Sequence, residues 1–298
     1  MTSAPALPHD HGRALPPPDP DTDGVLALAE AAAEALTQLR AATPLVQCLT
    51  NEVTTNLVAS SLLAVGASPA MAAVPGEAEE LVGVAGALLV NLGTPGPDQR
   101  ACVEPTVAAA AGARTPWVLD PVAVGVLSVR TRLAARLVAA SPAVVRGNAS
   151  EVRALAGRAS AGRGVDATDA VDAARDAAVE VARRHGTVVA VSGAVDLVTD
   201  GRHEVRLAVG HPWLTLVTGA GCALGGLVAA FAAVTEPLVA AVAASTLVGV
   251  AGERAAVGAA GPASFAVALV DHLHTTSPDD LARRVLAAAR VQTVQVAA

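Results

Sequence analysis

The sequence contains no lysine: all 20 of its Lys and Arg residues are arginines. Walker-type P-loop enzymes, pyridoxal-phosphate enzymes and Schiff-base aldolases each depend on a lysine amine, so these three classes are excluded. Any phosphate group that the protein binds must therefore be held by arginine, by backbone amides or by a metal ion.

Cysteine is also scarce. Cys48, Cys102 and Cys222 are an odd, scattered set without Cys-x-x-Cys or paired histidine spacing, which argues against a disulfide framework and a zinc site. The start Met1-Thr2-Ser3 lacks the basic and apolar segments of a secretory signal. We therefore expect a cytoplasmic protein.

Positive charge is sparse as well. The net charge is -7, the pI is near 5.5, and the longest basic runs are pairs such as Arg183-Arg184. Because non-specific nucleic-acid binders carry basic patches, we expect small-molecule partners and no nucleic acid.

Residues 222–250 carry one charge, Glu236, and are long enough to span a membrane. Alanine, glycine and valine dominate this stretch, Pro237 interrupts it, and no basic flank orients it. The sequence thus predicts two buried helices and no membrane partner.

The chain is long enough for one large domain, with 53% apolar residues to build its core. Residues 1–23 are rich in Pro, His and Asp and have no hydrophobic period, so we interpret them as a disordered N-terminal tail. We assign residues 24–298 to a single domain because no linker composition interrupts them.

Helical patterns alternate with short apolar runs in this domain. That alternation predicts an α/β fold, with a mainly parallel central sheet covered by helices on both faces. The first predicted helices are Val25–Leu39 and Thr54–Val65, and the predicted strands are 44–49, 67–71, 87–92, 117–120, 143–146 and 187–192.

Ligands of such folds bind at the carboxyl edge of the sheet, so polar residues after the apolar runs are candidates. These residues are Asn51, Asn91, Asp120, and Arg146 with Asn148. An alternative interpretation of Asn148 is a helix N-cap, with Glu151 as the carboxylate that reaches back to it.

The segment Thr218-Gly219-Ala220-Gly221-Cys222 opens a long apolar helix. Glycines allow close approach of a ligand, and the free N–H groups of a helix start suit an anion such as a transferred phosphoryl group. We expect the helix start to lower the pKa of the Cys222 thiol below about 8.5, which would let it orient or deprotonate an alcohol. The alternative is a small buried hydrophobe.

Several ordered motifs together resemble the hydroxyethylthiazole kinase family over nearly the whole chain after the tail. They include Pro44-Leu45-Val46-Gln47-Cys48-Leu49-Thr50-Asn51, Gly66 to Ala72, Asn91-Leu92-Gly93-Thr94, Asp120-Pro121-Val122, Arg146 to Glu151, Gly164-Val165-Asp166 and Thr218 to Cys222.

The resemblance implies a ribokinase-like three-layer α/β/α fold and a homotrimer with active sites between subunits. It also implies phosphorylation of 4-methyl-5-(2-hydroxyethyl)thiazole by ATP with Mg²⁺, for thiamine salvage. Carried over by position, the implied site comprises Met71, Asn51 and Gly219 at the substrate, Arg146, Ser192, Thr218 and Gly221 at ATP, Asp120 and Glu151 at Mg²⁺, and Cys222 as the catalytic residue.

The chain departs from the family pattern at several positions. Gln47 stands where the family usually has His, Glu52 where it has an amide or apolar residue, and Ala194 where it has Glu; Ala123 alters the turn after Asp120-Pro121. Two alternatives therefore remain. One is a dehydratase that repairs hydrated nicotinamide cofactors, against which Cys222 argues because that enzyme normally has Asp there. The other is a thiazole-binding homologue without catalysis.

Overall fold

The structure, a computed structural model, describes residues 20–158 and 167–294. Its strands are β1 Leu45–Leu49, β2 Ser68–Ala70, β3 Ala87–Asn91, β4 Trp117–Asp120, β5 Val144–Asn148, β6 Val188–Ser192, β7 Asp196–Thr199, β8 His203–Leu207 and β9 Ala289–Thr293. Its α-helices are α1 Pro20–Ala42, α2 Thr55–Val65, α3 Glu77–Val82, α4 Pro97–Ala113, α5 Ser128–Val138, α6 Ala149–Leu155, α7 Ala167–His185, α8 Ala220–Ala232, α9 Pro237–Gly258, α10 Pro262–Thr275 and α11 Pro278–Ala288, with 3-10 helices η1 Glu52–Thr54 and η2 Pro212–Leu216.

The strands form one sheet in the order β2-β1-β3-β4-β5-β6-β7-β8-β9. The pairs from β2 to β6 are parallel, whereas β6 to β9 pair antiparallel. The predicted mainly parallel α/β sheet is thus confirmed. The antiparallel extension β7–β9 was not predicted, because its short strands mix charged and apolar residues and give no continuous apolar run.

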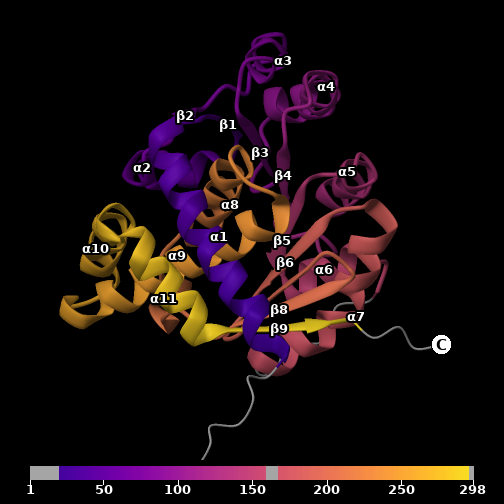
Figure 1. The fold of residues 1–298 in the computed structure, drawn as a ribbon. Coiled ribbons are helices and arrows are strands. Elements are labelled where there is room, and N and C mark those ends of the chain that lie inside the picture. Colours follow the sequence, from indigo (N-terminus) through magenta and orange to yellow (C-terminus); the bar gives the residue numbers. More distant parts are fainter. Residues whose placement is uncertain (1–19, 159–166, 295–298) are drawn as a thin grey trace, which may run out of the picture.

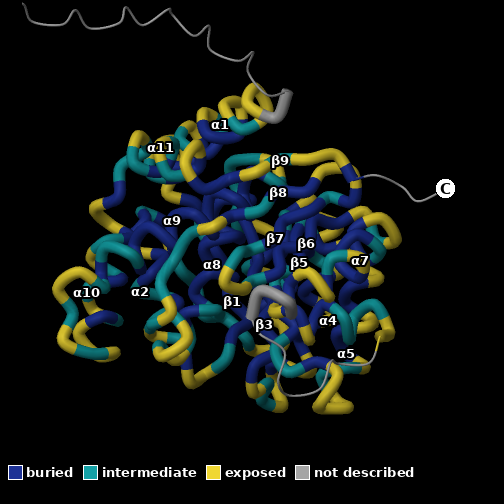
Figure 2. The backbone as a smooth tube through the Cα atoms, turned by 90° about the horizontal axis from the view of Figure 1, so that it is seen from below, coloured by how far each residue is buried: buried dark blue, intermediate teal, exposed yellow. Residues whose placement is uncertain are grey.

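Helices cover both faces of the sheet, which confirms the three layers (Figure 1). Successive strand residues alternate between two hydrophobic clusters: Leu89 packs with α1, α2 and α8–α11, while Leu88 and Val90 pack with α3–α7. This period of two follows from the pleat of a strand, and it explains why the parallel strands are apolar on both faces. Figure 2 shows the buried backbone concentrated in these strands and in α8 and α9.

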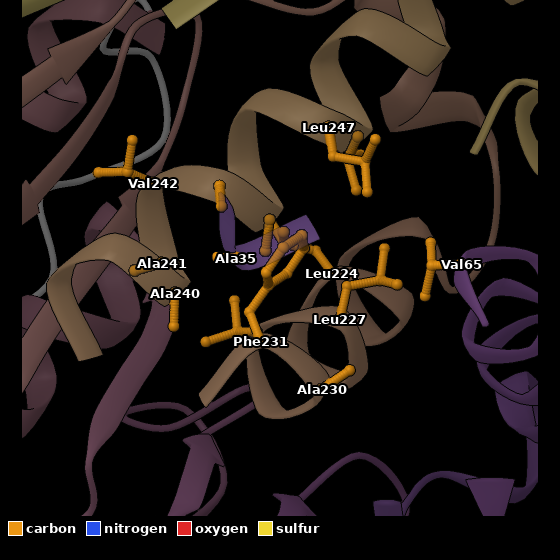
Figure 3. Close-up of a cluster of buried hydrophobic side chains, with 14 of the residues drawn as sticks. Ala35, Val65, Leu224, Leu227, Ala230, Phe231, Ala240, Ala241, Val242 and Leu247 are labelled. Atoms are coloured by element: carbon orange, nitrogen blue, oxygen red, sulfur yellow. The ribbon is translucent and has the colours of Figure 1, made fainter. Parts of the chain in front are cut away.

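Helices α8 and α9 are the two buried helices expected from residues 222–250, separated at Glu236-Pro237. Phe231 and Leu227 of α8 pack against residues of α9, as Figure 3 shows. Helix α9 is long and apolar enough to span a membrane, but 83% of its most apolar window is buried inside the protein. Helix α9 is therefore apolar because it lies in the core of the protein.

The boundary of the predicted N-terminal tail needs correction. Residues 1–19 lie outside the described residues, but α1 begins at Pro20, so residues 20–23 are helical and not part of a tail. Proline suits the first turn of a helix, and the acidic Asp23 favours that turn but interrupts the hydrophobic period of the sequence. Helix α1 packs against α11 and β9, which brings the two ends of the described chain side by side (Figure 1).

Candidate active site

The polar residues after neighbouring parallel strands meet at one edge of the sheet, as predicted. Asn91 of β3 is in register with Asp120 of β4, and Asn148 of β5 is in register with Ser192 of β6. Because neighbouring strands lie about 4.8 Å apart, these side chains form a continuous polar row.

Asp120 is the carboxylate of this row and is buried, with 1% of its surface exposed. Its Oδ2 accepts a hydrogen bond of 2.6 Å from Asn91 Nδ2, while its Oδ1 is buried without a hydrogen-bond partner. The pKa of Asp120 is raised to about 7, mainly by burial and also by the nearby Glu151, while the charge of Arg146 and the hydrogen bond from Asn91 oppose the rise. The site therefore holds a carboxylate that lacks full compensation for its charge.

Arg146 links three elements of the edge. Its Nη2 donates a hydrogen bond of 2.9 Å to Ser192 Oγ, and its Nη1 lies 3.8 Å from Asp120 Oδ1. A Cβ added to Gly221 would lie 2.7 Å from Nη1, so the start of α8 packs directly against the guanidinium. The structure thus brings Asp120, Arg146, Ser192 and Gly221 together.

Glu151 caps α6. Its Oε2 accepts from Asn148 N at 2.9 Å, Asn148 Oδ1 accepts from Glu151 N at 3.0 Å, and Glu151 Oε1 accepts from Ala123 N at 2.9 Å. The capping interpretation of Asn148 and Glu151 is confirmed. The contact with Ala123 also holds the altered turn after β4 against α6, so Glu151 positions this turn beside Asp120.

The turn before α8 requires glycine at position 219. Gly219 has φ +91°, a left-handed conformation that strains other residues, and a Cβ there would lie 2.7 Å from Thr54 Cγ2. The segment therefore opens a helix at the site, as predicted. The residues before it form the 3-10 helix η2.

The prediction that the helix start lowers the pKa of the Cys222 thiol is wrong. Burial raises this pKa and the negative charge of Asp120 raises it further, while hydrogen bonds with Thr54 and Asn91 and the charge of Arg146 oppose the rise. The sequence places Cys222 at a helix start but does not show the buried carboxylate next to it. At neutral pH Cys222 is therefore a neutral thiol.

The remaining predicted residues lie around this cluster. Asn51 caps η1 through a 3.0 Å hydrogen bond from Val53 N, and a Cβ added to Gly93 would lie 2.7 Å from Asn51 Nδ2. Thr218 is exposed. Met71 follows β2, is half-buried and packs against the core that contains α8; its contact with a substrate stays a prediction.

Gln47 has a structural role that its departure from the family motif did not reveal. Its side chain is fully buried in β1, and its Nε2 donates to Ala72 O at 3.1 Å and to Ala78 O at 2.9 Å. It therefore ties the segment after Met71 to the sheet.

A cavity of about 600 Å³ lies beside the cluster of Asp120, Arg146, Ser192 and Gly221. Arg146, Ser192 and Gly221 form its polar end, and Val209, Pro212, Leu214, Leu224 and Val248 are apolar side chains of its wall. An apolar pocket with a polar, arginine-containing end suits a nucleotide, with its base on the apolar wall and its phosphates at the arginine.

Asp196 is a wall residue that sequence reasoning missed. It begins β7, lines the cavity, and accepts a 2.8 Å hydrogen bond from Gly193 N at Oδ1. Burial raises its pKa to about 6, opposed by the hydrogen bond from Gly193 and the charge of Arg146. Asp200-Gly201 between two short alternating segments is a hairpin signal that points to β7 and β8, and thus to Asp196.

Within residues 20–158 and 167–294, no group of three or more His, Cys, Asp or Glu side chains converges as a metal site. Mg²⁺ at a phosphoryl-transfer site commonly uses one or two carboxylates, water and substrate phosphates. The orphaned Oδ1 of Asp120 and its raised pKa fit such a partly protein-held ion.

Solved structures with this fold include small-molecule kinases. The chain is similar to pyridoxal kinase of Bacillus subtilis with a TM-score of 0.53 at 16% identity, covering 70% of this chain and 91% of that one. It is more similar to the hydroxyethylthiazole kinase protein of Pyrococcus horikoshii, with a TM-score of 0.79 and 37% identity over 89% of this chain and 99% of that one. Fold and site define a kinase of the ribokinase-like class.

The family model "Hydroxyethylthiazole kinase family" matches residues 36–279. Proteins named hydroxyethylthiazole kinase are 54% identical in Clavibacter sepedonicus, over 89% of this chain and 96% of that protein, and 53% identical in Kineococcus radiotolerans, over 84% and 92%. The chain belongs to the hydroxyethylthiazole kinase family. Membership of a kinase family implies ATP as its co-substrate.

Proposed function

We propose that the protein transfers the γ-phosphate of ATP to the primary alcohol of 4-methyl-5-(2-hydroxyethyl)thiazole, for thiamine salvage. The observation that carries the proposal is the packing of the α8 start against Arg146 and Asp120, beside the cavity. Free N–H groups of a helix start, an arginine and a carboxylate at one point suit phosphoryl transfer, which depends on alignment and charge neutralisation.

On the nucleotide side, the base lies against the apolar wall and the phosphates lie at Arg146 and at the α8 start. The guanidinium already makes a hydrogen bond with Ser192, which fixes its orientation. Gly221 has no side chain and so lets the start of α8 pack directly against the guanidinium, and Thr218 is an exposed residue just before the helix. These four residues are our proposed ATP-binding set.

Asp120 and Glu151 hold Mg²⁺ and its waters in this proposal. Asp120 offers Oδ1, a buried acceptor without a partner. Both oxygens of Glu151 already accept backbone N–H groups, so we assign Glu151 to a water of the ion rather than to the ion itself. The ion supplies neutralisation of phosphate charge when bound, and it would also relieve the raised pKa of Asp120.

On the alcohol side, Asn51, Met71 and Gly219 form the proposed substrate pocket, and Cys222 is the catalytic residue. Because Cys222 is a neutral thiol, its role is to orient the hydroxyl at the α8 start, not to remove its proton before transfer. The loose transition state of phosphoryl transfer needs little prior deprotonation.

We also propose a cytoplasmic homotrimer with its sites between subunits. Val53 and Leu216 are 70% and 56% exposed, and they belong to η1 and η2, the elements that adjoin the Thr54–Gly219 contact. A neighbouring subunit that covers these apolar side chains would close the substrate pocket. Native mass spectrometry tests this proposal, and a monomer at assay concentration would contradict it.

The test of the activity is a coupled ADP-release assay with ATP, Mg²⁺ and hydroxyethylthiazole, with hydroxymethylpyrimidine and pyridoxal as parallel alcohols. We expect turnover with the thiazole and little with the other two. No turnover by a folded protein that still binds the thiazole would instead favour a binding protein without catalysis. Chelation of Mg²⁺ is the control for the metal, and undiminished turnover would remove the ion from the proposal.

A further inference from the structure

The place of each strand in the sheet indicates how far its residues lie from the phosphate end of the cavity. Asp120 ends β4, Arg146 lies in β5, Ser192 ends β6, Asp196 begins β7, and β8 leads into Val209. Since these strands are successive neighbours, each step moves about 4.8 Å further from the transfer point. Asp196 therefore stands between the phosphate end and the apolar end, where a nucleotide has its sugar.

Asp196 is chemically distinct at this place. Among the described residues that line the cavity it is the only carboxylate, because position 194 carries alanine. Only Oδ1 has an assigned hydrogen bond, from Gly193 N, and this bond fixes the carboxylate against the β6–β7 turn. A side chain without donors, fixed at the sugar position, is an acceptor for hydroxyl groups.

A purely structural role explains the position less well. The turn requires one acceptor for Gly193 N–H, which a serine or asparagine also supplies. A carboxylate in a cavity wall costs desolvation energy, and burial does raise the pKa of Asp196. Its negative charge would also repel the triphosphate, so a contact with an uncharged part of the nucleotide suits it better.

We propose that Asp196 accepts hydrogen bonds from the ribose hydroxyls of the nucleotide and makes the protein select ribonucleotides over deoxyribonucleotides. The inference rests on the proposed use of the cavity for ATP and names a residue that determines which nucleotide is used. Asp196 binds and selects; it takes no part in the transfer itself.

The experiment compares ADP with 2′-deoxyADP and 3′-deoxyADP by calorimetry, and the matching triphosphates by kcat/KM with the thiazole. We expect the wild type to prefer the ribonucleotide over at least one deoxy form by about tenfold or more, the effect of one hydrogen bond to a charged group. Asp196→Ala should reduce that preference to less than about threefold. Asp196→Ser, which keeps an acceptor for Gly193, should also lose most of it.

Asp200→Asn is the matched control. Asp200 caps the opposite end of the same hairpin, accepting from Arg202 N at 2.7 Å and His203 N at 2.6 Å. This variant should keep the wild-type preference for ribose. Thermal unfolding of all variants shows whether they are folded.

Equal binding of ribo- and deoxynucleotides by the wild type would overturn the inference, as would an unchanged preference in folded Asp196→Ala and Asp196→Ser. The calorimetric measurement does not depend on catalysis, so it distinguishes a failure of this inference from a failure of the proposed kinase function. A protein that prefers ADP through Asp196 but phosphorylates no alcohol supports the inference and contradicts the kinase reaction.

Discussion

Two regions of the sheet treat buried charge in opposite ways. At the carboxyl edge of the parallel strands, Asp120 Oδ1 and Arg146 Nε are buried without hydrogen-bond partners. In the antiparallel extension, the fully buried Glu204 accepts from Arg175 Nε at 2.6 Å, from Arg206 Nε at 3.0 Å and from Gln292 Nε2 at 3.2 Å.

This difference in pairing distinguishes the candidate active site at the carboxyl edge from the antiparallel extension, which has a structural role. A buried charged group that is fully paired is compensated within the fold, whereas one that lacks partners raises the free energy of the unliganded protein. Ligands with complementary charge remove that penalty when they bind. Substitutions at the first region should therefore change activity more than stability, and substitutions at the second should do the reverse.

The largest effect on activity is expected from Asp120→Asn. We expect kcat/KM to fall by about 10²- to 10³-fold, since the site loses the charge proposed to hold Mg²⁺. The amide retains an acceptor for Asn91, so the fold should persist. Steady-state kinetics with the thiazole measures the loss, and a folded variant with near-wild-type activity would place the metal elsewhere.

The same variant should alter the pH dependence of stability. The pKa of Asp120 is about 7 in the folded protein and about 3.9 in an unfolded chain, so the folded state binds the proton more tightly. The contribution of Asp120 to the unfolding free energy is thus full below about pH 4 and is lost as the pH rises to about 7. Asp120→Asn should weaken this decline in urea titrations without Mg²⁺; an identical decline would contradict the raised pKa.

Arg146→Ala should have the next largest effect. We expect it mainly to raise the KM for ATP, by about 10- to 100-fold, because it removes the charge proposed to hold the phosphates. Arg136→Ala is the matched control: Arg136 makes two hydrogen bonds with Glu104 on the surface, far less buried than Arg146. An unchanged KM in folded Arg146→Ala would remove Arg146 from the nucleotide site.

Cys222 tests whether orientation or deprotonation matters at the transfer point. We expect Cys222→Ala to lower kcat by about tenfold through loss of alignment, and Cys222→Asp to keep or increase it. Cys102→Ala, at a buried cysteine of α4 that donates to Ala73 O and Gln99 O and does not line the cavity, should leave kcat unchanged. An inactive but folded Cys222→Asp protein would count against the proposed role.

The parallel half of the fold could be predicted from sequence because its strands are apolar on both faces. Site residues at the strand ends, such as Asp120 and Arg146, could then be predicted as well, because parallel strands end at one edge of the sheet. The direction of the Cys222 pKa shift could not be predicted, because it depends first on burial in the folded protein and then on Asp120, which is 102 positions away in sequence.

The antiparallel half was harder to predict for a physical reason. Strand β8 alternates polar and apolar residues, and its buried Glu204 reads as an exposed position until its partners are known. Those partners come from α7, β8 itself and β9, the last of which is almost ninety residues away. Asp196 was missed with the strand that carries it.

The smallest effect on activity and the largest on stability should come from Glu204→Gln. The substitution removes the charge that pairs with Arg175 and Arg206 and points an amide donor at one of their N–H groups. We expect the unfolding free energy to fall by about 3 kcal/mol, as when a buried ion pair loses one partner. Urea unfolding measures this loss.

The control for this variant is Glu104→Gln, which breaks the exposed ion pair with Arg136 and should cost less than about 1 kcal/mol. Both variants should keep kcat within about twofold at a temperature where they are folded, since neither residue adjoins the cavity. If Glu204→Gln instead lost kcat while remaining folded, the extension would take part in catalysis, and the division between a paired scaffold and an unpaired site would fail.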